Sequence, residues 1–551
     1  MERIKGNIVL IRQQKVCFAA LELDEGRIKK TEMLDEREVP GQPYILPGFI
    51  DSHVHIESSM LVPAEFARLA VVHGTVATVS DPHEIANVCG VEGVNYMIDN
   101  GNTVPFKFNF GAPSCVPATV FETAGATLGV KGVTELLARK EIKYLAEMMN
   151  FPGVLMKDAV VMDKIKAAHK AGKPVDGHAP GLRGDDARTY VAAIADPAAG
   201  LRGTDHECFT KEEALDKLNA GMKILIREGS AAKNFEALID LLNDYPDDMM
   251  FCSDDKHPDS LEEGHINRLC ARAVEKGIPV FNVLKAACIN PVLHYGLDVG
   301  LLAEGDPADL IMVKDLVRFE VEKTFINGQL VAENGKTLIK ATKAPVLNNF
   351  SCTFKEPDSF KVPANGSKIV PVIEALDGQL ITHKLLLEPR IIDGLYVSDT
   401  DRDILKIAVV NRYRDAPIAT AFIKNFGLKK GAIASSVAHD SHNIIAVGVD
   451  DESLCKAVNK IIAAKGGVSA VMGEEEQIVP LPIAGLMSNK DGYKVAAAYT
   501  GIDQMAKRMG ATLAAPFMTL SFMALLVIPE LKLSDKGLFD GQRFEFIAKI
   551  S

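Results

Sequence analysis

The sequence predicts an α/β fold: a (β/α)8 barrel of the TIM type, a small β-sandwich domain built from both flanks of the barrel, and an additional α+β C-terminal domain. Eight short apolar runs alternate with helical stretches between Tyr44 and Leu302, over the roughly 250 residues of one such barrel. Chemically reactive residues follow most of these runs. In such a barrel the loops after the strands form the active site, so these residues would lie together on that face. A doubly wound open sheet would instead gather them at one switch point.

The segments on both sides of the barrel show strand alternation. "NIVLI" and "VCFAALELDEGRIKK" predict two short strands joined by a polar turn. After the barrel, "GDPADLIMVKD" and "FEVEKTFINGQLVAENGK" return to the same pattern with turn glycines. We expect residues 1–45 and 303–343 to form the small β-sandwich domain, and residues 46–302 to form the barrel.

Each predicted barrel strand ends in polar residues. The eight strand ends are "YILPGFIDSHVH", "GTVATVSDPHE", "PFKFNFGAPS", "IKYLAEMMN", "KPVDGHAP", "GLRGTDHEC", "MKILIREGS" and "MMFCSDDKHP". Between them, "TKEEALDKLNA" and "KNFEALIDLLNDY" place apolar residues three and four apart, which predicts amphipathic helices.

Residues 344–551 are long enough for a domain of their own. "ILKIAVVNRY", "HNIIAVGVD" and "SAVMGEEEQIVPLPIAG" predict strands, and "DDESLCKAVNKIIAAKG" predicts a helix. The longest apolar stretch, "LAAPFMTLSFMALLVIP", is shorter than the roughly 20 residues of a membrane span and contains an internal proline. We expect it to lie in a buried core.

Composition excludes several classes of function. The net charge of −12, without a basic stripe, argues against nucleic-acid binding, which needs a basic face. Nine scattered cysteines without CxxC pairs, and an N-terminus without a signal-peptide pattern, predict a cytoplasmic protein that does not contact membranes. A homodimer is the default assembly for such a chain.

The stretch "LPGFIDSHVHIESS" sets His53 and His55 one residue apart at a strand end. Residues i and i+2 of a strand point to the same side, so both imidazoles enter one cavity, where they could share a divalent metal. Two histidines on one strand face are also common in ordinary cores. The pair alone leaves both interpretations open.

Further metal-ligand types follow other strands: His178 in "PVDGHAP", His206 in "RGTDHEC" and Asp254 in "MMFCSDD". Each alone could be a core histidine or a helix-capping aspartate. Together with His53 and His55 they make five such residues at the same end of one predicted barrel. The set favours a metal site.

These residues resemble the amidohydrolase superfamily of metal-dependent barrel hydrolases. "PGFIDSHVH" matches the signature on its first strand, and His178, His206 and Asp254 match its ligands from strands five, six and eight. Many members carry a carboxylated lysine on strand four. This chain departs from that pattern: "IKYLAEMMN" offers Glu147, which could bridge two cations. Glu147 could equally be a surface carboxylate of an amphipathic helix.

Within the superfamily, the chain resembles the bacterial-type adenine deaminases. "IESSM", "SDPHEIANVCG", "DGHAPGL", "CSDDKHPD" and the long C-terminal block carry this resemblance over essentially the whole chain. It implies the hydrolysis of adenine to hypoxanthine and ammonia in purine salvage. It also implies two divalent cations, Mn or Fe, with Zn admitted by the nitrogen and oxygen ligands.

Two other functions remain as alternatives. A cyclic-amide hydrolase of the dihydroorotase or dihydropyrimidinase type can use the same ligands, but the missing strand-four lysine and the extra C-terminal block speak against it. A non-catalytic scaffold on the same barrel would be expected to have lost ligands, whereas all five are present.

The expected chemistry assigns roles to the remaining residues. A metal pair about 3.5–4 Å apart lowers the pKa of a bridging water from about 15.7 toward about 7, and we expect Asp254 to take the proton of that water. Glu84, in "SDPHE", is the expected acid, with His83 as a second candidate and as a substrate ligand. Asp255 and Arg227 are further expected substrate ligands. Glu84 and His83 could alternatively belong to the acidic first turn of a helix.

The C-terminal segment "SSVAHDSHNIIAVG" contains His439 and His442 with an aspartate between them. We interpret this segment as a turn, because Asp and Asn side chains readily form hydrogen bonds with their own backbone. The alternative is a further metal or substrate loop over the barrel mouth.

Overall fold

In the computed structural model, which describes residues 2–547, the eight predicted runs form one parallel sheet in chain order. The sheet closes on itself, because the Asp254 N–H donates to the His53 carbonyl at 2.9 Å and the His55 N–H donates to the Asp254 carbonyl at 3.2 Å. The predicted barrel is therefore confirmed. Its strands are β5 (Phe49–Val54), β6 (Thr75–Ser80), β7 (Lys107–Ala112), β8 (Ile142–Met148), β9 (Val175–Gly177), β10 (Thr204–Asp205), β11 (Lys223–Arg227) and β12 (Met249–Cys252).

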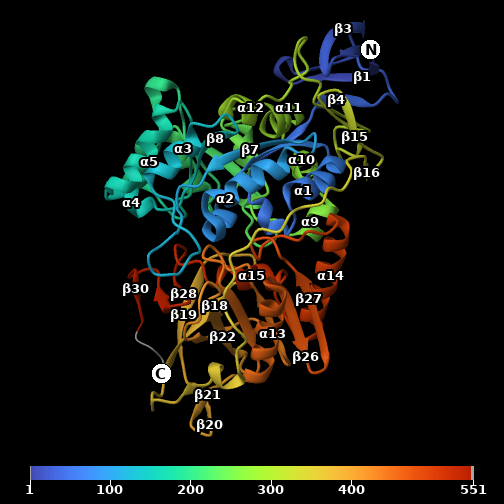
Figure 1. Ribbon diagram of the computed structural model, residues 1–551. Helices are drawn as coiled ribbons and strands as arrows, with labels where there is room; N and C mark the ends of the chain where they lie inside the picture. Colours follow the sequence, from blue (N-terminus) through green and yellow to red (C-terminus); the bar gives the residue numbers. More distant parts are fainter. Residues whose placement is uncertain (1, 548–551) are drawn as a thin grey trace.

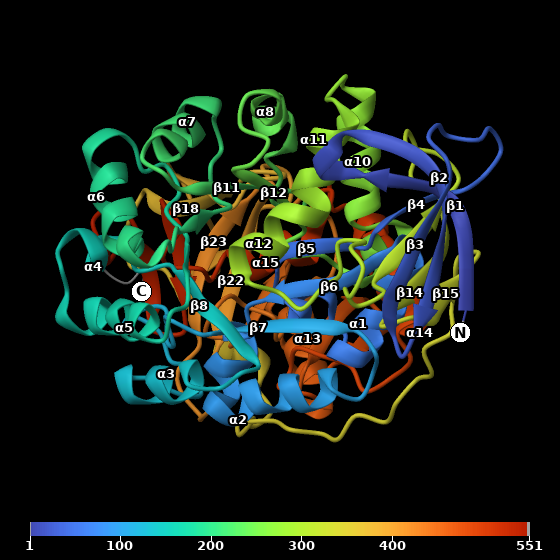
Figure 2. The ribbon, with the colours of Figure 1, turned by 90° about the horizontal axis from the view of Figure 1, so that it is seen from above.

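Helices surround the barrel strands (Figure 2). They are α1 (Pro63–Ala70), α2 (His83–Gly101), α3 (Val130–Leu137), α4 (Phe151–Leu155), α5 (Ala159–Lys170), α6 (Gly184–Ile194), α7 (Lys211–Asn219), α8 (Phe235–Leu238), α9 (Pro258–Glu263), α10 (Ile266–Glu275), α11 (Val280–Leu284) and α12 (Asn290–Tyr295). Only part of the helix predicted for "KNFEALIDLLNDY" is α-helical, namely α8. It continues as a 3-10 helix over Ile239–Asn243. Phe235 and Leu238 of α8 and Leu241 of the 3-10 helix are three apart and all buried.

The strands flanking the barrel in sequence share one eight-stranded sheet, in the order β16-β15-β14-β13-β4-β1-β2-β3. Its strands are β1 (Glu2–Leu10), β2 (Lys15–Asp24), β3 (Arg27–Asp35), β4 (Tyr44–Pro47), β13 (Leu310–Val313), β14 (Val321–Ile326), β15 (Gln329–Glu333) and β16 (Lys336–Thr337). The limits of the three domains stay a prediction.

Two turns divide runs that the sequence analysis read as continuous. The expectation of two N-terminal strands was wrong: Glu25 and Gly26 both take positive φ, 49° and 79°, and split the second strand into β2 and β3. At Gly48 the chain passes from the flanking sheet into the barrel. A Cβ at this position would lie 2.3 Å from Val76 Cγ1, so only glycine fits.

The C-terminal part forms a second α/β unit on one end of the barrel (Figure 1). Its main sheet runs β19-β18-β23-β22-β25-β24-β26-β27 and contains the strands that the sequence predicted. The elements are β17 (Val362–Pro363), β18 (Val370–Ala375), β19 (Thr382–Leu387), β20 (Arg390–Ile392), β21 (Leu395–Val397), β22 (Ile404–Val410), β23 (Ala419–Lys424), β24 (Ala432–Ser435), β25 (Ile444–Gly448), α13 (Asp451–Ala464), β26 (Gly467–Met472), β27 (Glu475–Pro480), α14 (Gly492–Arg508), α15 (Pro516–Phe522), β28 (Leu531–Ser534), β29 (Gly537–Asp540) and β30 (Glu545–Phe546).

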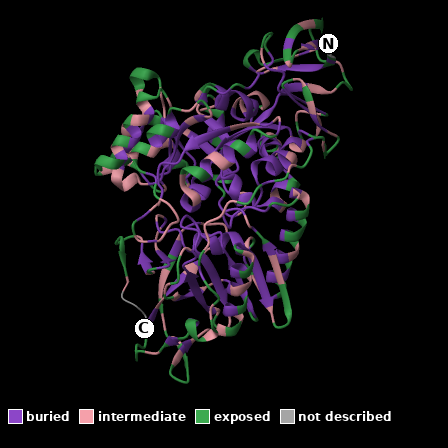
Figure 3. Ribbon diagram, in the orientation of Figure 1, coloured by how far each residue is buried: buried purple, intermediate pink, exposed green. Residues whose placement is uncertain are grey.

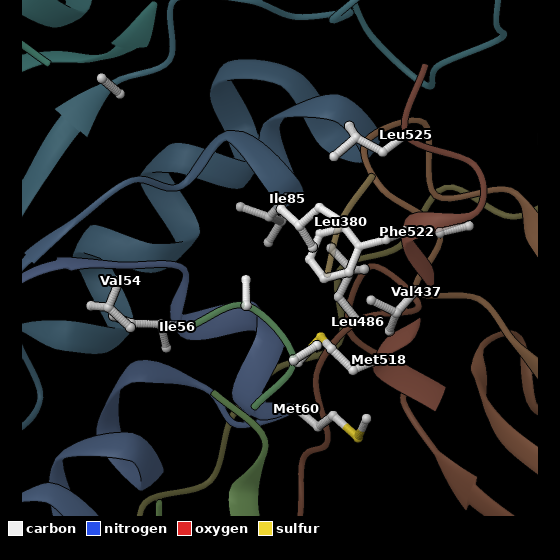
Figure 4. Packing of buried hydrophobic residues seen from close by; sticks show 14 of the residues in the cluster. Val54, Ile56, Met60, Ile85, Leu380, Val437, Leu486, Met518, Phe522 and Leu525 are labelled. Atoms are coloured by element: carbon white, nitrogen blue, oxygen red, sulfur yellow. The ribbon is translucent and has the colours of Figure 1, made fainter. Parts of the chain in front are cut away.

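This C-terminal unit packs on the barrel end where the strands finish. Met60 and Ile85 of the barrel lie in one apolar cluster with Leu380, Met518 and Phe522 of the C-terminal unit (Figure 4). The chain around this junction is largely buried (Figure 3). The apolar stretch 513–529 lies mostly in this buried region, as expected. Among the described residues, none of the helices is long and apolar enough to cross a membrane.

Candidate metal centre

Six buried side chains converge at the carboxyl ends of the barrel strands, and they are the residues predicted as metal ligands: His53, His55, Glu147, His178, His206 and Asp254. Asp254 Oδ1 lies 3.6 Å from His53 Nε2 and 3.2 Å from His55 Nε2. The two histidines point the same way, with their Nε2 atoms 3.2 Å apart. The strand geometry thus places both imidazoles in one cavity.

Glu147 lies in strand β8 with its carboxylate in the middle of the cluster, not on a helix surface. Its Oε1 is 3.4 Å from His55 Nε2. Its Oε2 is 2.9 Å from His178 Nδ1 and 3.1 Å from His206 Nε2. The two oxygens therefore face two different groups of imidazoles, which is the arrangement that a carboxylate bridging two cations requires.

The chemistry of the cluster fits divalent cations. Burial, followed by the neighbouring His206 and His55, holds the pKa of His53 well below its usual value, so its nitrogen keeps the lone pair that a ligand needs. Burial opposes ionisation of Glu147, yet the charges of His178 and His206 hold its pKa well below the usual range. His178 Nε2 and His206 Nδ1 have no hydrogen-bond partner among the described residues. Imidazole and carboxylate ligands without thiolate suit Mn, Fe or Zn.

Asp51 fixes the strand ends that carry the ligands. Its carboxylate accepts from the Ser253 N–H at 3.0 Å and lies 2.8 Å from His265 Nε2. Because Asp51 is two residues before His53 and Ser253 precedes Asp254, this network ties β5 to the end of β12 beside the metal ligands. This network could not be predicted from the sequence, since Asp51 and His265 are 214 residues apart.

Arg227 lies behind the cluster rather than on the cavity wall. Its fully buried guanidinium donates from Nη1 to Asp254 Oδ2 at 2.7 Å and from Nη2 to Glu207 Oε2 at 3.1 Å. Burial opposes ionisation of Asp254, but Arg227 and then His55 hold the pKa of Asp254 well below its usual range. We therefore correct the expected substrate contact: Arg227 positions Asp254.

Replacing Arg227 by Met is expected to destabilise the protein by about 3–5 kcal/mol, because the buried Glu207 carboxylate would lose its counter-charge and Asp254 Oδ2 would lose its hydrogen-bond donor. Urea denaturation of the metal-loaded protein measures the effect. Arg227→Lys, which keeps the charge, should restore part of the loss. Equal stability of the Met variant and the wild type would contradict the positioning role.

Glu84 and His83 open helix α2 at the cavity wall. Asp81 lies 3.0 Å from His83 Nδ1 and accepts from the His83 N–H at 3.0 Å. The N-terminal turn and the cavity position thus coexist. Asp255 also lines the cavity, where it accepts a hydrogen bond from Ser58 Oγ at 2.5 Å. Burial and the neighbouring Asp254 raise the pKa of Asp255 to about 6.

The C-terminal unit contributes directly to the same cavity. His439 Nδ1 lies 2.5 Å from Glu84 Oε1, and His442 Nε2 contacts the other oxygen of that carboxylate. We expected both histidines to belong to a turn only, and this contact with Glu84 was not predicted. The short spacing of "HDSH" was the only available signal, because Glu84 is 355 residues away from His439. Leu380, Phe522 and Leu525 add an apolar wall.

Comparison with known proteins agrees with this geometry. Residues 44–331 match the amidohydrolase family, and residues 379–545 match the adenine deaminase C-terminal domain. An adenine deaminase of Salinibacter ruber is 54% identical over 549 residues, covering 99% of this chain and 98% of that protein. An adenine deaminase of Sulfurovum sp. is 54% identical, covering 99% of both chains. One of Methanosarcina acetivorans is 51% identical, also covering 99% of both.

Proposed function

The chain belongs to the adenine deaminases of the amidohydrolase family, and from this premise we propose how its buried cluster replaces the 6-amino group of adenine by oxygen. The protein is a metal-binding hydrolase that consumes adenine and water and releases hypoxanthine and ammonia. The observation that carries the mechanism is the position of Glu147, with one oxygen facing each group of imidazoles.

Six residues would hold two cations, Mn or Fe in preference to Zn: His53, His55, Glu147, His178, His206 and Asp254. When bound, such a pair lowers the pKa of water toward about 7 and so supplies a nucleophile at neutral pH. The two carboxylates offset part of the cationic charge. Burial of all six side chains excludes bulk water and strengthens their electrostatic interactions.

Asp254 takes the proton of the attacking water and passes it to the departing amine. One oxygen, Oδ1, faces His53 and His55, while Oδ2 is held by Arg227. This fixed orientation matters because Asp254 is a weak base. Its role depends on placement within hydrogen-bond reach of the proton.

Glu84 delivers a proton to the ring of adenine, which makes C6 more electrophilic. Burial opposes ionisation of His439, but the Glu84 carboxylate and Asp255 raise the pKa of His439 to about 9. At neutral pH the buried pair therefore holds one proton that it can release toward the cavity. Water adds its oxygen to C6, the remaining hydroxyl proton returns to the Glu84–His439 pair, and the 6-amino nitrogen leaves as ammonia.

The cavity wall suits a flat purine. His83 and Asp255 provide polar groups to contact its ring nitrogens, and Leu380 and Phe522 provide apolar surface for its faces. The other lining residues are mostly ionisable, so the polar groups fix the orientation of the purine and the few apolar side chains cover its faces.

We further propose a cytoplasmic homodimer that does not bind nucleic acid. The nine cysteines, none of them in a disulfide, support a reducing compartment. The net charge of −12 supports the absence of a nucleic-acid partner.

The test of substrate choice is an assay of the manganese-loaded protein with adenine, adenosine, guanine and dihydrouracil. Equimolar ammonia and hypoxanthine from adenine are expected, with much slower turnover of the other three compounds. Ring opening of dihydrouracil without release of ammonia from adenine would overturn the proposal in favour of cyclic-amide hydrolysis.

A further inference from the structure

A second cavity lies at the opposite end of the barrel, where strands β9 to β12 begin. Its volume is about 490 Å³. Pro174 precedes β9, Arg202 precedes β10, Lys223 opens β11 and Asp247 precedes β12. Helix α12 adds His294 to the wall. The cavity shares none of its lining residues with the metal centre.

This cavity is positively charged although the chain as a whole is acidic. Four cationic side chains line it: Arg12, Arg202, Lys223 and Lys285. The opposing carboxylates are Asp247, which accepts from Lys285 Nζ at 2.7 Å, and Asp248, which accepts from Arg202 Nη1 at 2.5 Å. Lys223 Nζ shares Asp248 at 3.3 Å. Two cationic charges are therefore left in excess.

Arg12 supplies one of these excess charges. It projects from the flanking sheet, in the short 3-10 turn after β1, and is exposed. Among residues 2–547, its side chain has neither an ion-pair partner nor a hydrogen-bond partner. An exposed guanidinium beside a cationic cavity is free to bind an anion.

His294 is a second, independent feature of the cavity. Its Nε2 atom is buried and has no hydrogen-bond partner among the described residues. Burial, and then the charges of Lys223 and Arg202, lower the pKa of His294 to about 3, so the ring is neutral. A neutral imidazole held among cations has one N–H to donate, and an anion would satisfy it.

We propose that this cavity binds a small phosphate monoester. Guanidinium and ammonium groups recognise phosphate oxygens by charge-assisted hydrogen bonds. The volume exceeds the needs of a bare phosphate and lies within the range of about 300–1,000 Å³ for small-molecule sites. Pro174, Leu201 and Ile289 provide apolar wall for the organic part of the ester. The proposal does not depend on the deaminase mechanism.

The test is calorimetric titration of the full-length, manganese-loaded protein with ribose 5-phosphate, inorganic phosphate and ribose, none of which contains a purine. One ribose 5-phosphate per chain is expected, with weaker binding of phosphate, no binding of ribose, and an affinity that falls with added NaCl. The variant Arg12→Ala/Lys285→Ala should weaken binding roughly tenfold or more, because it removes two charged groups. Its adenine turnover without ligand should be unchanged.

Lys131→Ala, which alters an exposed lysine on helix α3, is the matched control and should bind as the wild type does. Failure of ribose 5-phosphate to bind at millimolar concentrations would overturn the proposal. So would an unchanged affinity in the double variant, since binding would then lie elsewhere. Equal affinity for phosphate and ribose 5-phosphate would replace the monoester by a bare-anion site.

Discussion

Asp254→Asn is expected to lower kcat for adenine by about 10³-fold, while two cations per chain remain bound. The amide has nearly the shape of the carboxylate and can still offer one oxygen to a cation, but it cannot accept the proton of water. Proton transfer by a positioned group contributes about 10²–10⁴-fold to catalysis. Steady-state kinetics together with metal analysis of the same preparation measure both quantities.

The matched control for Asp254→Asn is Asp244→Asn, the same change at an exposed aspartate between β11 and β12. Its kcat should equal that of the wild type. If Asp254→Asn kept more than about a tenth of the wild-type kcat, the loss would fall short of the smallest contribution expected of a general base. The proton would then have to be accepted by another group.

Glu147→Gln is expected to abolish most of the activity by weakening metal binding. The cluster has two carboxylates to oppose the two proposed dications. The change removes the charge of the one that faces both groups of imidazoles. We expect the variant to lose about 4 kcal/mol of transition-state stabilisation, which corresponds to a rate about 10³-fold lower. The variant should also bind fewer cations and, since bound ligands stabilise the folded state, melt at a lower temperature.

Glu135→Gln, an exposed glutamate on helix α3, controls for the loss of a charge. Added manganese should raise the activity of Glu147→Gln more than that of this control, because the defect lies in affinity. A Glu147→Gln protein with full metal content and wild-type kcat would show that this carboxylate is not a bridge.

The barrel and its strand-end residues could be predicted from the sequence because local chemistry specifies them. His53 and His55 occupy alternate positions of one strand, so their common direction follows from the pleat. His178, His206 and Asp254 each end a recognisable apolar run. The pattern could not decide between strand and helix for Glu147, and the structure places it in β8.

Contacts between distant segments could not be predicted. Arg227 ends a strand and was expected to meet substrate, but the pairing with Asp254 and Glu207 turns it inward. The spacing of "HDSH" does not show which residue the histidines meet, because the contact between His439 and Glu84 depends on how the C-terminal unit docks on the barrel. The turn at Glu25 and Gly26 was carried by a local signal, "DEG", inside a run that is otherwise strand-like.

The most direct test of the central claim is anomalous X-ray diffraction from crystals of the manganese-loaded protein. Two peaks are expected, one on each side of the Glu147 carboxylate, with His178 and His206 at one and His53, His55 and Asp254 at the other. Strong peaks elsewhere, or a single peak that Glu147 does not touch, would contradict the account.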